Sequence, residues 1–419
     1  MADPAFDVAV IGAGQAGLGI SYFLKHYGMR HIVFERGRIG ESWRAQRWDS
    51  FVLNSPNRFN ILPGDTYDGA NPDGFDSAKS FVSYLEGYAN RFQLPVQEHA
   101  RVVSVERNSS AYHVTAFVHG TMRRYVCRQV IVASGAMNEQ RIPSFAKNIS
   151  SNVRQYHAGE YRAPSGLPDG AVLVVGSAQS GLQVAEDIIE AGQRVYLSTS
   201  AVGRVPRRYR GKDILEWLVK VGFYDVKTEN VTDPKDFELK QPQVSGVGPL
   251  GHTLSLQSLA RRGVVVIGKI DSAGGNLVNL QPNAADHIKF GDEVSHRIKA
   301  SIEQFITENH LNVPPPDLDP ADEPDANGTC ASSMRSLDLE KENIRSIIWA
   351  TGFTGDFTYL KGSVIDGNGR PVHRNGISNV AGLYYLGFPW LRKRKSGIIN
   401  GIVEDATFIA EHVKSAASR

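Results

Sequence analysis

The sequence predicts an α/β fold built from two Rossmann-like, three-layer domains of the dinucleotide-binding type, with the second domain inserted in the first. Three observations predict this fold. A buried strand, a glycine-rich turn and a helix follow one another over residues 6–27, and the same order returns over residues 171–190. A further apolar strand at residues 344–349 runs into Ala-Thr-Gly-Phe. The expected units are 1–165 with 336–419, and 166–335, which carries an insertion.

The first glycine turn, GAGQAG, joins an apolar strand to an amphipathic helix. Gly12 is expected to allow the tight turn, Gly14 to let the backbone approach a pyrophosphate, and Gly17 to let the helix pack on the strand. The free N–H groups and the dipole of the helix N-terminus favour phosphate charge, so Gln15 and Ala16 belong to the candidate site. A glycine turn of an unrelated α/β protein is the alternative.

An acidic residue follows the second strand of this unit. The strand at 31–34 ends at Glu35, 23 positions after Gly12 and near the spacing of about 20 residues expected for the acid that binds a ribose hydroxyl. Arg36 comes directly after it. The first unit therefore predicts the ribose site of FAD or NAD.

Composition and charge exclude several classes of protein. A hydrophobic content of 41% is ordinary for a globular chain, and a formal charge of +2 argues against a general nucleic-acid binder. The two cysteines, Cys127 and Cys330, lie far apart, which argues against a dithiol centre or a thiolate metal site. With no signal-peptide pattern and no apolar run of about 18 residues, a cytoplasmic protein without a membrane anchor is expected.

An irregular segment rich in Trp, Arg, Asn and Pro follows, over residues 39–64. A segment of this length without regular structure is usually functional. Trp43 and Arg44 are candidates to line an aromatic ring and a phosphate, with Ser42 beside them. The alternative is a surface loop with two buried tryptophans. A helix is then expected at 79–92, and strands at 102–105, 112–118 and 125–132.

The second glycine turn, GSAQSG, follows a strand at 171–175 and opens a helix at 179–190. Ala178 replaces the middle glycine and is still small. Two such turns in the same context are a much stronger signal than one. The candidate residues of this turn are Gly176, Ser177, Gln179, Ser180 and Gly181.

The strand at 194–198 ends in hydroxyls rather than in an acid. Ser198 stands near the position that Glu35 has in the first unit, and a basic stretch with Arg204, Arg207 and Arg208 follows. An acid would repel a 2′-phosphate, whereas arginine can bind one with two hydrogen bonds. The first unit is therefore assigned to FAD and the second to NADPH. A solvated basic loop is the alternative for the arginines.

The remaining elements are expected in the following order. Residues 214–219 predict a short helix, 224–245 an insertion or mobile flap, 253–260 a helix and 264–267 a strand. Residues 294–309 predict a helix and 314–327 a linker. The strands 336–339 and 344–349 are expected to form a hairpin. A strand at 383–386, a basic run at 392–395 and a helix at 399–414 complete the chain.

These motifs resemble the flavin-containing monooxygenases and related class B flavoprotein monooxygenases over nearly the whole chain. The resemblance depends on GAGQAG with Glu35 and Arg36, on GSAQSG, on the segment ending in ATGF, and on the tryptophan-containing stretch. Disulfide reductases of related fold need a cysteine pair that this chain lacks. Of the family's fingerprint before the second turn, His157 and Tyr161 are present, while Ser151 and Val153 replace the Phe and the Gly.

The resemblance implies an NADPH- and O2-dependent FAD enzyme that oxygenates the nitrogen or sulfur of a small molecule through a C4a-(hydro)peroxyflavin. By position Asn54 matches an asparagine that the family places over the flavin, and His157 matches a residue that links the two domains. Further cofactor contacts are implied at Val103, Thr351 and Gly352. No metal, nucleic acid or membrane is expected, and a homodimer is left open. The alternatives are a Baeyer–Villiger enzyme or flavin oxidase or dehydrogenase, and a non-catalytic redox sensor.

Overall fold

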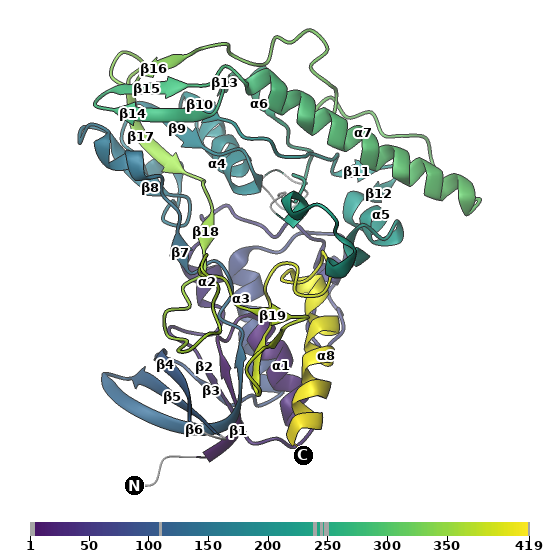
Figure 1. The fold of residues 1–419 in the computed structure, drawn as a ribbon. Helices are drawn as coiled ribbons and strands as arrows, with labels where there is room; N and C mark the ends of the chain where they lie inside the picture. The colour runs from purple at the N-terminus through teal and green to yellow at the C-terminus, as the bar shows by residue number, and fades with distance from the viewer. Residues whose placement is uncertain (1–4, 109–110, 238–240, 244–245, 247–250, 418–419) are drawn as a thin grey trace.

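The computed structural model describes residues 5–108, 111–237, 241–243, 246 and 251–417. The chain forms two lobes (Figure 1). One contains both ends of the described chain, and the other contains most of the middle of the sequence. Each lobe is built around its own sheet, so the predicted two-domain α/β architecture is confirmed.

The first sheet has β1 at its centre. In this sheet β1 (Ala5–Ile11) pairs in parallel with β2 (His31–Phe34) and with β6 (Thr121–Val132). The order across the sheet is β19-β20-β21-β6-β1-β2-β3, and β4 and β5 extend from β6 as an antiparallel meander. The other strands are β3 (Val96–Gln97), β4 (Ala100–Asn108), β5 (Ala111–Val118), β19 (His373–Arg374), β20 (Ile377–Ser378) and β21 (Leu383–Tyr385).

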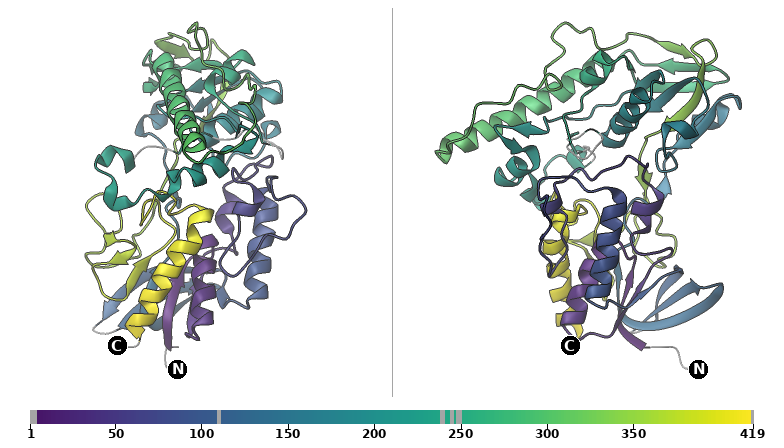
Figure 2. Two further views of the ribbon diagram at one scale, coloured as in Figure 1. Left: turned by 90° about the vertical axis from the view of Figure 1, so that its right-hand side faces the viewer. Right: turned by 180° about the vertical axis from the view of Figure 1, so that it is seen from behind.

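Both faces of this sheet are covered around β1, which explains why the central strands β1 and β2 are mostly apolar. Val8 and Val10 pack in one core with α1 (Gln15–His26), α3 (Ala78–Arg91) and α8 (Ile399–Ala417). The alternate side chains of β1 pack in a second core with the meander β4-β5-β6. The views in Figures 1 and 2 agree that α1 and α8 lie side by side.

The second sheet is parallel, with the order β13-β10-β9-β17-β8. Its helical face carries α4 (Gln179–Glu190) and α6 (Leu256–Arg261), and an antiparallel three-stranded sheet covers the opposite face. Its strands are β8 (Arg154–His157), β9 (Ala171–Val175), β10 (Val195–Ser198), β13 (Val265–Ile267) and β17 (Ile344–Trp349). The covering sheet consists of β14 (Ile270–Gly274), β15 (Leu277–Leu280) and β16 (Ser336–Asp338).

Two sequence-based expectations are corrected by this topology. The hairpin of 336–339 with 344–349 is wrong, because β16 pairs with β15 whereas β17 lies in parallel between β8 and β9. The expected boundaries at 165 and 335 also cut the second sheet, since β8 and β17 lie outside 166–335. Both differences have one cause: strand pairing is long-range, and an apolar strand does not specify its neighbour.

The helices of the second lobe follow the prediction with one extension. The helix α5 (Ile214–Lys220) begins as expected, whereas α7 (Ala284–Glu308) starts ten residues before the predicted 294. Its core-facing residues Ile298, Ile302 and Ile306 pack on Trp217 of α5. The expected linker 314–327 crosses the surface of this lobe, fixed to α7 by Asp322.

The two lobes are joined on two sides. On one side the short strands β7 (Glu139–Gln140) and β18 (Phe353–Thr354) pair where the chain passes between the lobes (Figure 1). On the other side the described part of the insertion pairs with the segment before α8. The backbone N–H groups of Thr228 and Arg394 donate to Arg392 and Val226 across this contact. We call residues 224–228 with 390–395 the clasp. The remaining short elements are α2 (Glu41–Ala45), β11 (Arg208–Tyr209) and β12 (Lys212–Asp213).

Candidate active site between the two lobes

The three glycines of the first turn have different roles. Gly12 has a φ of +105°, and a Cβ on it would lie 2.6 Å from the carbonyl oxygen of Ala133 at the end of β6. A Cβ on Gly17 would lie 1.8 Å from the carbonyl oxygen of Gly12, so α1 packs directly on the turn. Around Gly14 no described atom lies within 4 Å of such a Cβ. The open space at Gly14, where the helix begins, fits the approach of a pyrophosphate.

The N-terminus of α1 is free to bind an anion. Gly14 is its N-cap, no side chain accepts a hydrogen bond there, and the first turn contains no acidic residue. The helices α3, α5 and α6, by contrast, are capped by Ser77, Asp213 and Ser255. Uncapped N–H groups together with the helix dipole favour the binding of a phosphate at this end of α1.

Glu35 closes the first site at the end of β2. Its carboxylate accepts hydrogen bonds from the backbone N–H of Ala13 at 2.8 Å and of Gly37 at 3.0 Å. Burial raises the pKa of this carboxyl, and the two N–H donors oppose the shift. The acid therefore touches the glycine turn itself.

The second turn repeats this geometry. Gly176 has a φ of +106°, and a Cβ on Gly181 would lie 1.8 Å from the carbonyl oxygen of Gly176. Ala178 is the uncapped N-cap of α4 with φ −75° and ψ −179°, close to the −83° and −170° of Gly14. Because neither conformation needs a glycine, alanine preserves the turn. Ser180 is exposed in the first helical turn.

The hydroxyl groups of Ser198 and Ser177 in the second unit both form hydrogen bonds within the protein. Ser198 Oγ donates to the carbonyl of Gly268 at 3.0 Å, and Ser177 Oγ accepts from the N–H of Ser200 at 2.9 Å. Gln243, from the expected flap, donates its side-chain N–H to the carbonyl of Ser177. Gln243 of the insertion therefore lies against the second glycine turn.

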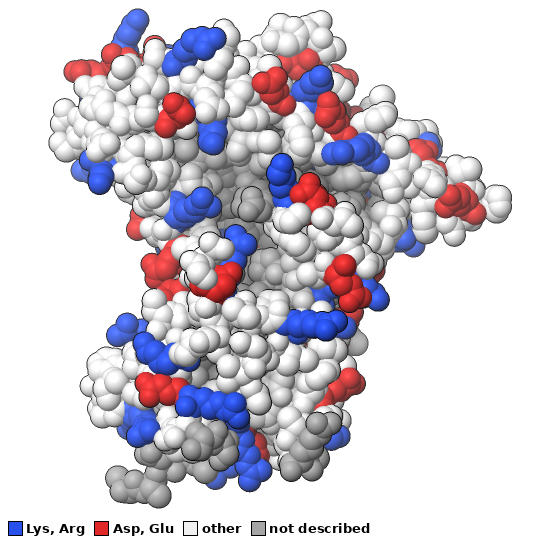
Figure 3. All heavy atoms as spheres, viewed as in Figure 1, with Lys and Arg blue, Asp and Glu red and all other residues white. Residues whose placement is uncertain are grey.

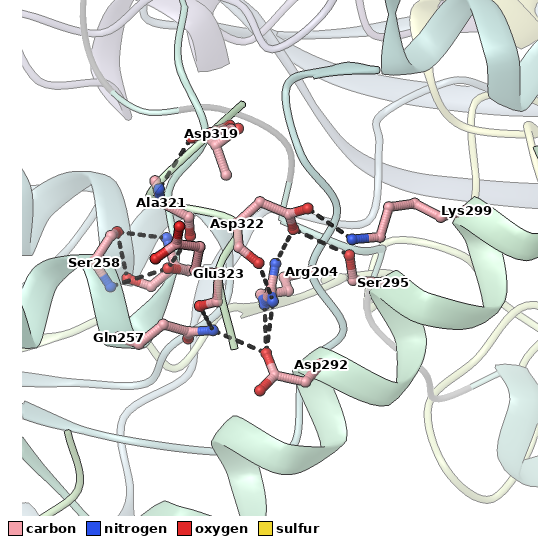
Figure 4. Close-up of polar contacts among 12 residues, drawn as sticks. Arg204, Gln257, Ser258, Asp292, Ser295, Lys299, Asp319, Ala321, Asp322 and Glu323 are labelled. Carbon is pink, nitrogen blue, oxygen red and sulfur yellow. Dashed lines mark hydrogen bonds and ion pairs between the residues drawn. The ribbon is translucent and has the colours of Figure 1, made fainter. Parts of the chain in front are cut away.

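Two of the three arginines assigned to a 2′-phosphate are buried in ion pairs. Arg204 binds Asp292 through Nε at 2.8 Å and also contacts Asp322 (Figure 4). Arg207 binds Asp213 and is 1% exposed. Arg208 is exposed. The sequence shows the basic run but not the carboxylates, which come from α7, the start of α5 and the surface segment.

One segment connects the starts of α1 and α4. Trp43 Nε1 donates to the side chain of Gln15, the first residue of α1, at 3.1 Å. Asn54 Oδ1 accepts from Gln183 Nε2, in the second turn of α4, at 3.1 Å. Between them Ser50 Oγ donates to Asp187, one turn further along α4, at 2.8 Å. The irregular segment 39–64 is therefore ordered by helices from both lobes.

The remaining candidates lie at the edges of these sites. Arg44 pairs with Glu86 of α3, so its charge is already matched within the first lobe. Val103 is the residue without a register partner at an irregularity of the β4–β5 pairing. Ser42 lies in α2 and Arg36 is exposed beside Glu35.

His157 lies at the end of β8, beside the segment after β17 where the chain passes between the lobes. Its Nε2 lies 2.9 Å from the carbonyl oxygen of Gly352, and its Nδ1 accepts from the N–H of Gly159 at 3.1 Å. Burial lowers the pKa of this imidazole, so it is neutral at neutral pH. Thr351 donates to the carbonyl of Arg141 in the same crossing. Tyr161, from the same fingerprint, is buried and donates to Asp187 at 2.5 Å.

Sequence reasoning missed two residues of this region, Gln183 and Gln243. Both are buried polar side chains, at 1% and 3% exposure. The signal available was weak: Gln183 stands at a core position of an amphipathic helix, where an apolar residue is usual. Gln243 lies in a segment without any periodic pattern.

The surface charges, the cysteines and the helices of the described chain give few further indications of function. Acidic and basic side chains are interspersed on the face in Figure 3, which is hollowed between the lobes. Within the described ranges, no three His, Cys, Asp or Glu residues converge as a metal site. Cys127 and Cys330 are free thiols. Among the described helices, none combines the length and the apolar character that crossing a bilayer requires.

A comparison with protein families matches residues 9–220 to the model described as pyridine nucleotide-disulphide oxidoreductase. An uncharacterized CzcO-like oxidoreductase of Geobacillus kaustophilus is 31% identical over 410 residues, which cover 97% of this chain and 98% of that protein. The chain belongs to the pyridine nucleotide-disulphide oxidoreductase family. A probable indole-3-pyruvate monooxygenase of Arabidopsis thaliana is 24% identical over 96% of this chain and 88% of its own length.

The solved structures agree with the fold of this oxidoreductase. A flavin-containing monooxygenase from Stenotrophomonas maltophilia superposes with a TM-score of 0.67 at 19% identity, covering 99% of both chains. The predicted resemblance to flavin-containing monooxygenases is therefore confirmed. The expected pair of cofactors, FAD and NADPH, agrees with the family and with these relatives.

Proposed function

We propose that the protein is an FAD-dependent monooxygenase that uses NADPH and O2 to oxygenate a nitrogen or sulfur atom of a small molecule. One observation carries the proposal: the segment from Trp43 to Asn54 joins the uncapped start of α1 to the start of α4. Two dinucleotides that bind these helix ends would bring their reactive rings to the same segment. Bound FAD would supply the redox chemistry, accepting hydride from NADPH and activating O2 as a C4a-(hydro)peroxyflavin.

The residues of the first lobe fit FAD. The open space at Gly14 would admit the pyrophosphate, the N–H groups of α1 would bind it, and Glu35 would bind a ribose hydroxyl. Asn54, at the junction of the lobes, would donate a hydrogen bond to the flavin or the nicotinamide. The chain's own role is to bind, orient and shield these rings from water.

The residues of the second lobe would hold NADPH at the start of α4. Of the basic run, Arg208 is the exposed member, and we assign it to the 2′-phosphate. Arg208→Ala should raise the KM for NADPH at least tenfold and leave the KM for NADH within twofold. Equal effects on both coenzymes would contradict this assignment.

A second candidate, oxidation at carbon, is favoured by one observation. The indole-3-pyruvate monooxygenase similarity extends over 96% of this chain. Oxygen uptake with NADPH should be screened with amines, thioethers, 2-oxo acids and cyclic ketones, and each product should be identified by mass. A product that gains one oxygen from an amine or thioether supports the first proposal, and turnover of only the carbonyl compounds supports the second.

Two outcomes would contradict both oxygenation proposals. Purified protein that binds no flavin would indicate a nucleotide-binding protein of another kind. Flavin-loaded protein that converts O2 only to H2O2, with every substrate in the screen, would indicate an oxidase.

A further inference from the structure

Gln183 is a buried polar residue in the core-facing part of α4. It is 1% exposed, and its neighbours Leu182, Val184 and Ala185 are fully buried. Its Oε1 has no hydrogen-bond partner among the described residues. Burying an unpaired amide oxygen is unfavourable, so an apolar side chain would stabilise this position better if packing were its only role.

The contacts of Gln183 fix the orientation of its amide. Nε2 lies 3.1 Å from Asn54 Oδ1 and 3.5 Å from the backbone carbonyl of Gly246. A backbone carbonyl can only accept a hydrogen bond, so the nitrogen of Gln183 must be on this side. Both amide hydrogens are then used, and Asn54 must present its oxygen to Gln183.

The orientation of Asn54 follows from this contact. Its Oδ1 is bound by Gln183, and its backbone carbonyl accepts from Arg207 at 2.8 Å. Its Nδ2 then has no partner in the described part of the chain. An NH2 group can only donate, so the free hydrogens of Asn54 are available to an acceptor in the cleft.

We propose that Gln183 is a positioning residue, which holds the Asn54 amide so that its NH2 group faces the bound cofactor. This inference rests on the proposed function, because it concerns a residue assigned to the flavin or the nicotinamide. It couples the two lobes: a residue of the NADPH-binding helix sets the donor that the flavin-binding lobe presents. A merely structural role, fastening segment 39–64 to α4, is served separately by Ser50, which binds Asp187.

A double-mutant cycle tests the proposal. Gln183→Leu and Asn54→Ala are compared singly and together, with Ser50→Ala as the matched control that removes a contact between the same segment and α4. Two quantities are measured in FAD-loaded protein: the change in the flavin absorption spectrum on binding of NADP+, and the fraction of oxidised NADPH that ends as H2O2.

If Gln183 acts through Asn54, Gln183→Leu should reduce the spectral change and raise the H2O2 fraction severalfold. It should have no further effect in the Asn54→Ala background, because coupled residues are not additive. Ser50→Ala should leave both quantities within a factor of 1.5 of the unmodified protein. Should Gln183→Leu fail to fold, Gln183→Met, which has nearly the same shape, replaces it in the cycle.

Additive effects of the two substitutions, in protein that binds FAD and NADP+, would overturn this inference and leave the proposed function standing. The same conclusion follows if Gln183→Leu changes the spectral response and the H2O2 fraction no more than Ser50→Ala does. Failure of the unmodified protein to bind flavin would overturn the proposed function, and the inference with it.

Discussion

Among the single residues of the first site, Glu35 is expected to contribute to cofactor binding. Its carboxylate accepts two backbone N–H groups of the first site. Hydrogen bonds to a charged group contribute about 1.5–3 kcal/mol. Glu35→Ala should therefore weaken FAD binding at least tenfold, as measured by flavin titration of the apoprotein. Glu41→Ala, which removes an acid of α2 that contacts the backbone N–H and the guanidinium of Arg38, is the control. Equal losses of affinity in both variants would contradict the ribose assignment.

His252 predicts a dependence of stability on pH. Its hydrogen bond with the fully buried Glu186, at 2.6 Å, raises the pKa of the imidazole above 6.5. The charged pair therefore contributes its full stability below pH 6.5, and this contribution is lost as the pH rises through the folded pKa. Because His252 is about half exposed, the contribution should stay below about 1 kcal/mol.

Urea unfolding of the unmodified protein and of His252→Gln at pH 6 and pH 9 measures the contribution of this pair to the unfolding free energy. The difference in unfolding free energy between the two proteins should be larger at pH 6. A larger difference at pH 9 would mean that the imidazole is neutral in the folded state. Arg262 also binds Glu186, at 2.6 Å, and keeps that carboxylate paired at both pH values.

At the scale of elements, substitutions in the first strand–turn–helix unit should distinguish effects on folding from effects on cofactor binding. Gly17→Ala would place a methyl group 1.8 Å from a backbone oxygen, which should destabilise the protein by at least about 3 kcal/mol. Gly14→Ala meets open space, so the unfolding free energy should change by no more than about 1 kcal/mol, while FAD affinity falls at least tenfold.

Thermal unfolding and flavin titration distinguish these two effects. Gly87→Ala is the control, because it lies in α3 with open space around it and should stabilise the helix by up to about 1 kcal/mol. Full FAD affinity in Gly14→Ala would contradict the assignment of the pyrophosphate to that space.

Elements were predictable where local pattern decides them. The helices at Gln179–Glu190 and Gln15–His26 and the strands at His31–Phe34 and Ala171–Val175 match their predicted bounds to within a residue, because burial on both faces and a glycine turn mark them. The pairing of β17 and the early start of α7 were missed. The residues that pack against β17 and against the start of α7 lie far away in the sequence, so the local hydrophobic periodicity does not indicate them.

For the whole molecule, we expect the ion pairs of the clasp to help hold the two lobes together. Lys393 and Lys395 contact Asp225 at 3.2 and 2.9 Å and Glu404 at 2.8 Å each. These carboxylates are partly exposed, so salt should weaken the pairing. In Asp225→Asn/Glu404→Gln, the backbone N–H groups across the clasp should exchange hydrogen several times faster than in the unmodified protein.

Hydrogen exchange followed by mass spectrometry, at low and high salt, measures this opening. Glu190→Gln is the control, since Glu190 pairs with Arg262 within the second lobe. Unchanged exchange at 224–228 and 390–395 in the double variant would mean that backbone pairing alone holds the clasp.

The amino-acid sequence is enough to predict the two-domain α/β class, the two glycine turns and the acid after β2, because each depends on residues within one strand–turn–helix unit. The folded structure is needed to show that β17 joins the second sheet, that Arg204 and Arg207 are buried in ion pairs, and that Gln183 contacts Asn54. Each of these contacts joins residues from different elements. A side chain's charge and size can be read locally, but its partner is set by how the chain packs.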